Sequence, residues 1–178
     1  MKKFAPPFIK YPLMALYILG RCLTRGRVPK KYVVMNMAGV LPPARQIIHG
    51  GKVKLIQVRD KFGETWKGFN TAYFASSGLP FAPTLWLKIY KMFGVKTVWN
   101  QNGFAYKALY PQRVVDRING LMKPMLLADF IVFQTKFTKH CAEQFVGPVT
   151  KPHEVIINPV DTKKFKPTDS TLTAEPFT

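Results

Sequence analysis

From about residue 70 onward, the chain alternates short, almost wholly apolar segments with longer segments whose apolar residues recur at helical spacing. The apolar segments are residues 71–75, 95–100, 129–134 and 154–158, and they are typical of strands that are covered on both faces. Strands of this kind that alternate with helices predict an α/β fold, in which a Rossmann-like parallel sheet is flanked by helices.

Three helices are predicted between these strands. The first begins at Pro83, ends at Gly94 and buries a stripe made of Leu85, Trp86, Ile89, Met92 and Phe93. The second has a stripe of Val114, Ile118, Leu121, Met122 and Met125, interrupted by Gly120 and kinked or broken at Pro124. The third is capped by Thr135 and is expected to bury Phe137, Cys141 and Phe145.

The first half carries weaker signals. Residues 32–37 and 52–58 are predicted to be strands, the latter because lysines and apolar residues alternate at its start. One or two helical turns are expected between them, ending at the pair Gly50 and Gly51. Residues 59–70 form a polar connection.

The charge of the chain points to an acidic partner. Its 178 residues include 27 Lys and Arg against 9 Asp and Glu, a formal net charge of +18. Nucleic acid, an anionic membrane surface and phosphorylated substrates all fit this excess, and solubility alone would also account for it. With 47% apolar residues the chain can bury one proper core.

Cysteine and histidine usage argues against a disulfide framework and against a zinc site. Cys22 and Cys141 are far apart, no C-x-x-C motif exists, and the adjacent His140 and Cys141 would point in different directions on a helix. The dinucleotide fingerprint G-x-G-x-x-G and the P-loop are also absent, so a nicotinamide dehydrogenase is not supported.

The N-terminal arm combines a basic start, an apolar run over residues 11–19 and a basic finish. The run is too short to span a bilayer, and no cleavage site for a signal peptide follows it. Two interpretations stay open, a helix that lies on a membrane and an ordinary packed helix.

Ligands of open parallel sheets collect at the carboxyl ends of the strands. These ends read "NMAG", "SSG", "NQNG", "QT" and "NPVD". Asn100, Gln101 and Asn102 before Gly103 form the most unusual cluster, because amides donate and accept hydrogen bonds and so suit a polyhydroxyl ligand. Gly103 is expected to let the backbone approach closely or take a positive φ. A polar turn that satisfies its own backbone is the alternative.

The run from Gly50 to Pro167 resembles the N-terminal domain of family-four retaining glycosyltransferases, which have the two-domain B-type fold. The motifs that carry the resemblance are "GGKVKL", "FNTAYFASSGLP", "VKTVWNQNGFAY", "LLADFIVFQTKFTKHCAEQFVG" and "INPVDTKKFKP", in this order. The resemblance implies one half of such an enzyme, which binds the acceptor. The other half would hold a nucleotide-sugar donor with two glutamates eight positions apart, a spacing that no pair among Glu64, Glu143, Glu154 and Glu175 has.

The resemblance also implies roles for residues. Gln101 and Asn102 would lie at the reacting centre, with Asn100, Gly103 and Tyr106 binding donor or acceptor beside them. Gly50 and Gly51 would lie near the donor phosphates, and Thr135 and Lys136 would touch donor or acceptor. Many relatives have a histidine where Asn102 stands; because an amide does not titrate, Asn102 could only position the acceptor.

The expected organisation is a basic and apolar arm over residues 1–30, a Rossmann-like domain over 31–167 and a tail or linker over 168–178. The expected substrates are a nucleotide sugar and a glycan or lipid-linked acceptor, without metal or other cofactor and without nucleic acid. The chain alone is expected to be inactive, to need a second chain or domain, and to lie in the cytoplasm, peripheral to the inner face of the plasma membrane. The alternatives are a non-catalytic membrane-associated fragment and a basic nucleic-acid-binding protein.

Overall fold

The structure, a computed structural model, describes residues 6–30, 33–38 and 52–157. In these ranges the elements are α1 (Pro7–Leu23), β1 (Met35–Met37), α2 (Lys52–Phe62), β2 (Thr71–Ala75), the 3-10 turn η1 (Ser76–Gly78), α3 (Pro83–Met92), β3 (Lys96–Gln101), α4 (Gln112–Gly120), the 3-10 turn η2 (Lys123–Leu127), β4 (Phe130–Phe133), α5 (Lys136–Phe145) and β5 (His153–Val155). The helical turns expected before Gly50 and the "NPVD" segment lie outside the described residues.

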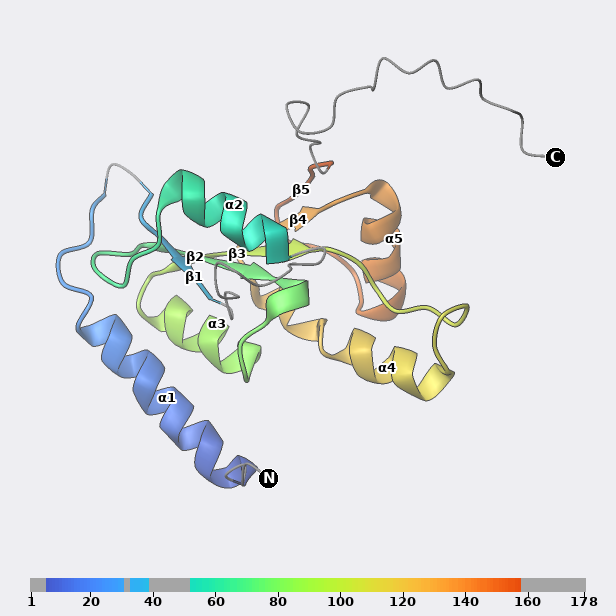
Figure 1. Cartoon of the computed structure of the whole chain (residues 1–178), viewed down its shortest axis with the longest axis horizontal. Coiled ribbons are helices and arrows are strands. Elements are labelled where there is room, and N and C mark those ends of the chain that lie inside the picture. The colour runs from blue at the N-terminus through green and yellow to red at the C-terminus, as the bar shows by residue number, and fades with distance from the viewer. Residues whose placement is uncertain (1–5, 31–32, 39–51, 158–178) are drawn as a thin grey trace, which may run out of the picture.

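The five strands form one all-parallel sheet in the order β1-β2-β3-β4-β5. Helices cover it on both faces, with α2 on one side and α3 on the other (Figure 1). This confirms the predicted α/β fold with a Rossmann-like parallel sheet.

The larger core lies on the α3 face. Phe74 of β2, Trp99 of β3 and Ile131 of β4 point to this side and pack under Tyr90 of α3 and Ile18 of α1, all of them fully buried. The Phe74 and Trp99 rings stack at 5.9 Å between centroids. Aromatic burial on this scale makes the α3 face the main source of hydrophobic stabilisation.

The α2 face buries a smaller cluster of Met35, Met37, Leu55, Tyr73 and Ala75. These strand residues alternate with those of the α3 face, as the period of two along a strand requires. Asn100 follows the same alternation, because Trp99 and Gln101 point toward α3 and Asn100 points toward α2.

The prediction of a strand at 52–58 is wrong, because these residues begin helix α2. Leu55 is fully buried and Val58 packs beside the same cluster, a spacing of three residues on one helix face. The helix continues through Lys61 and ends before Gly63, which has φ 73°. A short apolar run is ambiguous between strand and helix, and packing against β1 and β2 decides it here.

The other strands and helices follow the prediction closely, with differences at their buried faces. Met92 and Leu121 are exposed at 77% and 59%, and Phe137 is exposed at 69%. On α5 the buried residues are Thr138, Cys141 and Ala142. The predicted helical stripes are therefore partly wrong. The elements that pack against each helix decide which of its sides is buried, and that side does not contain all of its most apolar residues.

Candidate functional site

A polar network joins the carboxyl ends of three neighbouring strands. The backbone N–H of Asn102, after β3, donates to Ser76 Oγ at 2.9 Å, and its side-chain Nδ2 donates to Ser77 Oγ at 2.7 Å. Both serines follow β2. Asn102 Oδ1 accepts a hydrogen bond from Nε2 of Gln134, which follows β4, at 2.6 Å. The network therefore lies where parallel sheets of this class bind ligands.

The network is partly open to solvent. Ser77 is exposed, and Ser76, Asn102 and Gln134 are half-buried. Both serine oxygens accept a bond from Asn102, so each hydroxyl keeps its own hydrogen for a further acceptor. These groups can donate to the hydroxyls of a sugar-like ligand and position them, but none of them removes a proton at neutral pH.

Gln101 has a different environment from its neighbours. It is fully buried, its Oε1 accepts a bond from Trp99 Nε1 at 2.9 Å, and its Nε2 donates to the Gly103 carbonyl at 2.6 Å. Gln101 thus links the Gly103 carbonyl, at the start of the loop after β3, to the Trp99 side chain in the core. Gly103 itself has no positive φ, so that part of the expectation is wrong. A Cβ added to it would meet no atom within 4 Å, and a close approach of this backbone to a ligand stays a prediction.

Thr135 and Lys136 lie directly beyond Gln134. Thr135 Oγ1 accepts the backbone N–H of Thr138 at 3.0 Å and caps α5, as predicted. Lys136 is exposed, and Tyr106, in the loop after β3, is 48% exposed. Asn102 and Thr135 therefore share one edge of the sheet, whereas Gly50 and Gly51 lie outside the described residues.

Asn100 does not join this network. It is 3% exposed on the α2 face, and its Nδ2 donates to the Tyr73 hydroxyl at 2.6 Å. Burial raises the pKa of Tyr73, and the hydrogen bond from Asn100 opposes that rise, so the hydroxyl is protonated at neutral pH. The amide cluster of residues 100–102 is thus divided among the α2 face, the core and the open edge.

The predicted site lacks Ser76, Ser77 and Gln134, although all three follow strands as Asn102 does. It also lacks Asn119 of α4, whose side chain is buried. Asn119 Oδ1 accepts a hydrogen bond from the Ala105 N–H, and its Nδ2 donates to the Ala105 carbonyl, both at 2.9 Å, so Asn119 positions the loop after β3. Position after a strand would identify the first three, while nothing in the sequence distinguishes Asn119.

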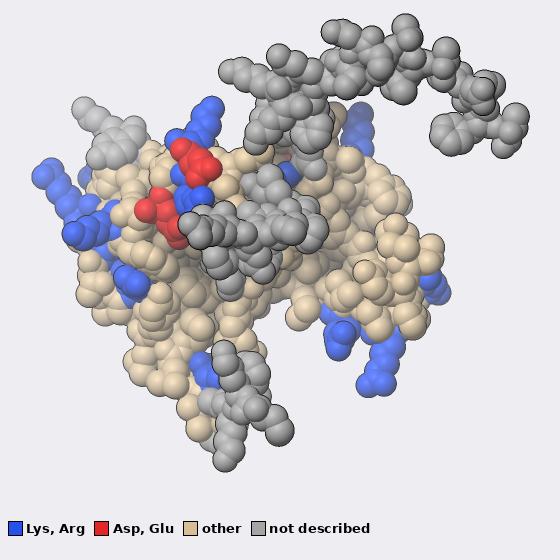
Figure 2. Space-filling model, in the orientation of Figure 1, with Lys and Arg blue, Asp and Glu red and all other residues tan. Residues whose placement is uncertain are grey.

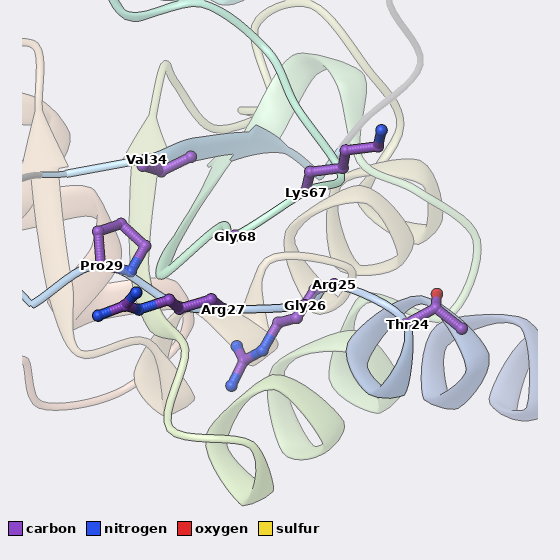
Figure 3. Close-up of a pocket in the computed structure, with 8 residues that line it drawn as sticks. All are labelled: Thr24, Arg25, Gly26, Arg27, Pro29, Val34, Lys67 and Gly68. Atoms are coloured by element: carbon purple, nitrogen blue, oxygen red, sulfur yellow. The ribbon is translucent and has the colours of Figure 1, made fainter.

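A cavity of about 470 Å³ opens at the opposite end of the sheet, at the amino ends of the strands (Figure 3). Arg25, Arg27 and Lys67 line it. The Arg25 guanidinium donates to the carbonyls of Phe93, at 2.6 Å, and Phe69, at 3.3 Å, so it ties the end of α3 to the segment that leads into β2. A Cβ at Gly68 would lie 2.9 Å from the Arg27 carbonyl oxygen, which makes glycine necessary there. These contacts indicate a structural junction.

The described residues hold no group of three or more His, Cys, Asp or Glu side chains that could bind a metal ion. Within the same ranges, no helix combines the length and apolarity needed to cross a bilayer. Figure 2 shows the Lys and Arg side chains in several separate groups on the face in view, not in one continuous patch.

No protein-family model, curated protein or solved structure matches this chain.

Proposed function

We propose that this chain is the acceptor-side domain of a family-four retaining glycosyltransferase, which binds a glycan or lipid-linked acceptor for transfer from a nucleotide sugar. The observation that carries the proposal is the network of Ser76, Ser77, Asn102 and Gln134 across the carboxyl ends of β2, β3 and β4. The glycosyltransferase-like motifs include the segments that supply these four residues.

In this proposal the chain contributes positioning. Hydroxyl and amide groups at the strand ends would hold an acceptor hydroxyl in line with the sugar to be transferred, which lowers the entropic part of the barrier. Transfer would take place only when a donor-binding domain, on this or another chain, faces the same edge. We therefore expect binding of sugars by these residues but no turnover by this domain alone.

The test is a titration of the ¹⁵N-labelled chain followed by NMR, with methyl glucoside, methyl galactoside, methyl mannoside, UDP-glucose and GDP-mannose as probes. We expect at least one probe to shift the amides of Ser76, Ser77, Asn102 and Thr135. Asn102→Ala removes the centre of the network and should weaken that binding about ten-fold, the effect of one or two hydrogen bonds.

Gln144→Ala is the matched control, because it removes an exposed amide from α5 away from the strand ends. It should leave binding unchanged. Shifts that are absent with every probe, or that are equal in the parent chain and in Asn102→Ala, would contradict the proposal.

Helix α1 supports a second part of the proposal, peripheral attachment to the cytoplasmic face of an anionic membrane. Ile9, Leu13, Leu16 and Leu23 lie along one side of α1 and are 42% to 70% exposed, while Ile18 and Cys22 on the opposite side are buried. The chain has no acidic residue before Asp60, but it has Lys10 and Arg21 within α1 and Arg27 shortly after it. Apolar insertion and attraction to anionic lipid would then act together.

Co-sedimentation with vesicles tests this part. The chain should bind vesicles containing phosphatidylglycerol and bind pure phosphatidylcholine weakly. Leu16→Glu should reduce binding roughly ten-fold or more, because burying one leucine contributes about 1.5–3 kcal/mol. Leu109→Glu, at a position that is 63% exposed in the loop before α4, is the control and should have little effect. Equal losses in both variants, or no binding to anionic vesicles, would refute membrane attachment through α1.

A further inference from the structure

A cavity of about 260 Å³ lies on the α2 face of the sheet, separate from the serine and amide network. Tyr73 and Asn100 come from neighbouring strands and lie at its wall, and Lys54 and Gln57 approach it from α2. The cavity is slightly smaller than most small-molecule sites, so it suits a compact ligand.

Asn100 supplies the observation that points to a ligand. Its Oδ1 is completely buried and has no hydrogen-bond partner in the described part of the chain. Buried polar atoms in folded proteins almost always have partners, and leaving one without a partner is costly. A ligand that donates to this oxygen would remove the cost.

The pair of Asn100 and Tyr73 offers one donor and one acceptor side by side. With Nδ2 donating to the Tyr73 oxygen, Asn100 Oδ1 remains as an acceptor and the Tyr73 hydrogen remains as a donor. If the amide is turned over, the Tyr73 hydroxyl donates to it, and the free groups become an amide N–H and a tyrosine lone pair. In both orientations the pair matches a ligand group that also carries a donor beside an acceptor, as a secondary amide does.

The rest of the cavity wall is divided between charge and hydrocarbon. Burial lowers the pKa of Lys54, and no carboxylate of the described residues forms an ion pair with it. Val58, Val132 and Ile156 supply apolar surface. An anionic group beside Lys54 would stabilise its charge, and a short hydrocarbon group would cover the valines and the isoleucine.

We propose that this cavity binds a small amphiphilic carboxylate that carries an amide, with the amide on Asn100 and Tyr73, the carboxylate beside Lys54 and the hydrocarbon against Val58 and Val132. The site does not depend on the sugar-binding network, because none of its residues belongs to that network.

The test uses N-acetyl-leucine, which combines these three features, together with two analogues that each lack one. 4-Methylpentanoate lacks the amide, and N-acetyl-leucinamide lacks the charge. We expect N-acetyl-leucine at millimolar concentration to shift the NMR signals of Val58, Val132 and Ile156, and we expect each analogue to bind about ten-fold more weakly.

Variants separate binding from folding. Asn100→Leu and Tyr73→Phe should each weaken binding of N-acetyl-leucine about ten-fold. Asn100→Leu should leave the denaturation midpoint unchanged or raise it, because it removes a buried oxygen that has no partner among the described residues. Lys54→Met should weaken binding of N-acetyl-leucine but not of N-acetyl-leucinamide, and Lys61→Met, at an exposed position on α2, should change neither.

The proposal is overturned if no probe shifts the signals of the cavity residues, or if Asn100→Leu and Tyr73→Phe bind N-acetyl-leucine as the parent chain does. Asn102→Ala should bind N-acetyl-leucine normally. This result keeps the outcome for the cavity distinct from the outcome for the proposed glycosyltransferase function.

Discussion

Three consecutive amide side chains show that the role of a residue in or beside a strand depends on the direction in which its side chain points. Asn100, Gln101 and Asn102 are adjacent in the sequence, but the alternation along β3 sends Asn100 toward α2 and Gln101 toward α3. Asn102 lies beyond the strand and reaches the serines after β2. Their shared chemistry suggests a shared role, but their directions give them three different ones.

Cys22 provides a prediction at the residue scale. It is 2% exposed in the larger core, and burial raises the pKa of its thiol, an effect that nearby Arg25 partly opposes. The unfolded chain therefore releases the thiol proton at a lower pH than the folded chain does. The stabilisation is complete below the usual thiol pKa and is lost as the pH rises toward the folded-state pKa.

We expect the free energy of unfolding to fall as the pH rises above about 8.5, by at most about 1.4 kcal/mol per pH unit from this one group. Denaturant unfolding at a series of pH values measures the slope. Cys22→Ala should be less stable overall but have a shallower slope between neutral and alkaline pH. An unchanged slope would show that Cys22 does not contribute to it.

At the scale of elements, α1 has two sides with different roles. Ile18 is fully buried against the α3 side of the core, whereas Leu16, two residues earlier, is 66% exposed. Tyr17 packs near Trp66 and Trp86, and the Arg21 guanidinium lies 4.5 Å from the centre of the Trp66 ring. Packing of one side of α1 is thus compatible with exposure of the other, so the two interpretations left open by the sequence do not exclude each other.

Alanine substitutions on the two sides of α1 test this division. Ile18→Ala should lower the free energy of unfolding by about 2–5 kcal/mol, because it leaves a cavity in the core. Leu16→Ala should change it by no more than about 0.5 kcal/mol. Chemical denaturation of both variants measures the difference, and similar values for the two would mean that α1 does not pack on α3 in solution.

At the scale of the whole molecule, the parallel sheet brings distant segments to one edge. Ser76, Asn102 and Gln134 are separated by 26 and 32 positions along the chain, yet they form one network because β2, β3 and β4 are neighbours with their carboxyl ends aligned. The same alignment places Tyr73 and Asn100 together on the opposite face from the main core. Both proposed sites are consequences of strand order and register.

The sequence alone determined the fold class, the strands β2, β3 and β4 and the cap of α5, because these depend on local signals. Short apolar runs, helix-breaking glycines and prolines and a capping threonine act over a few residues, and each can be recognised without its neighbours in space.

Only the tertiary structure decided that residues 52–58 are helical, which side of each helix is buried and which amide faces which cavity. Those outcomes depend on contacts between segments that are far apart in the sequence. Leu55 meets Met35 and Tyr73 only in the folded structure. The Asn100 oxygen, which has no hydrogen-bond partner among the described residues, is buried only because β2, β4 and α2 come together around it.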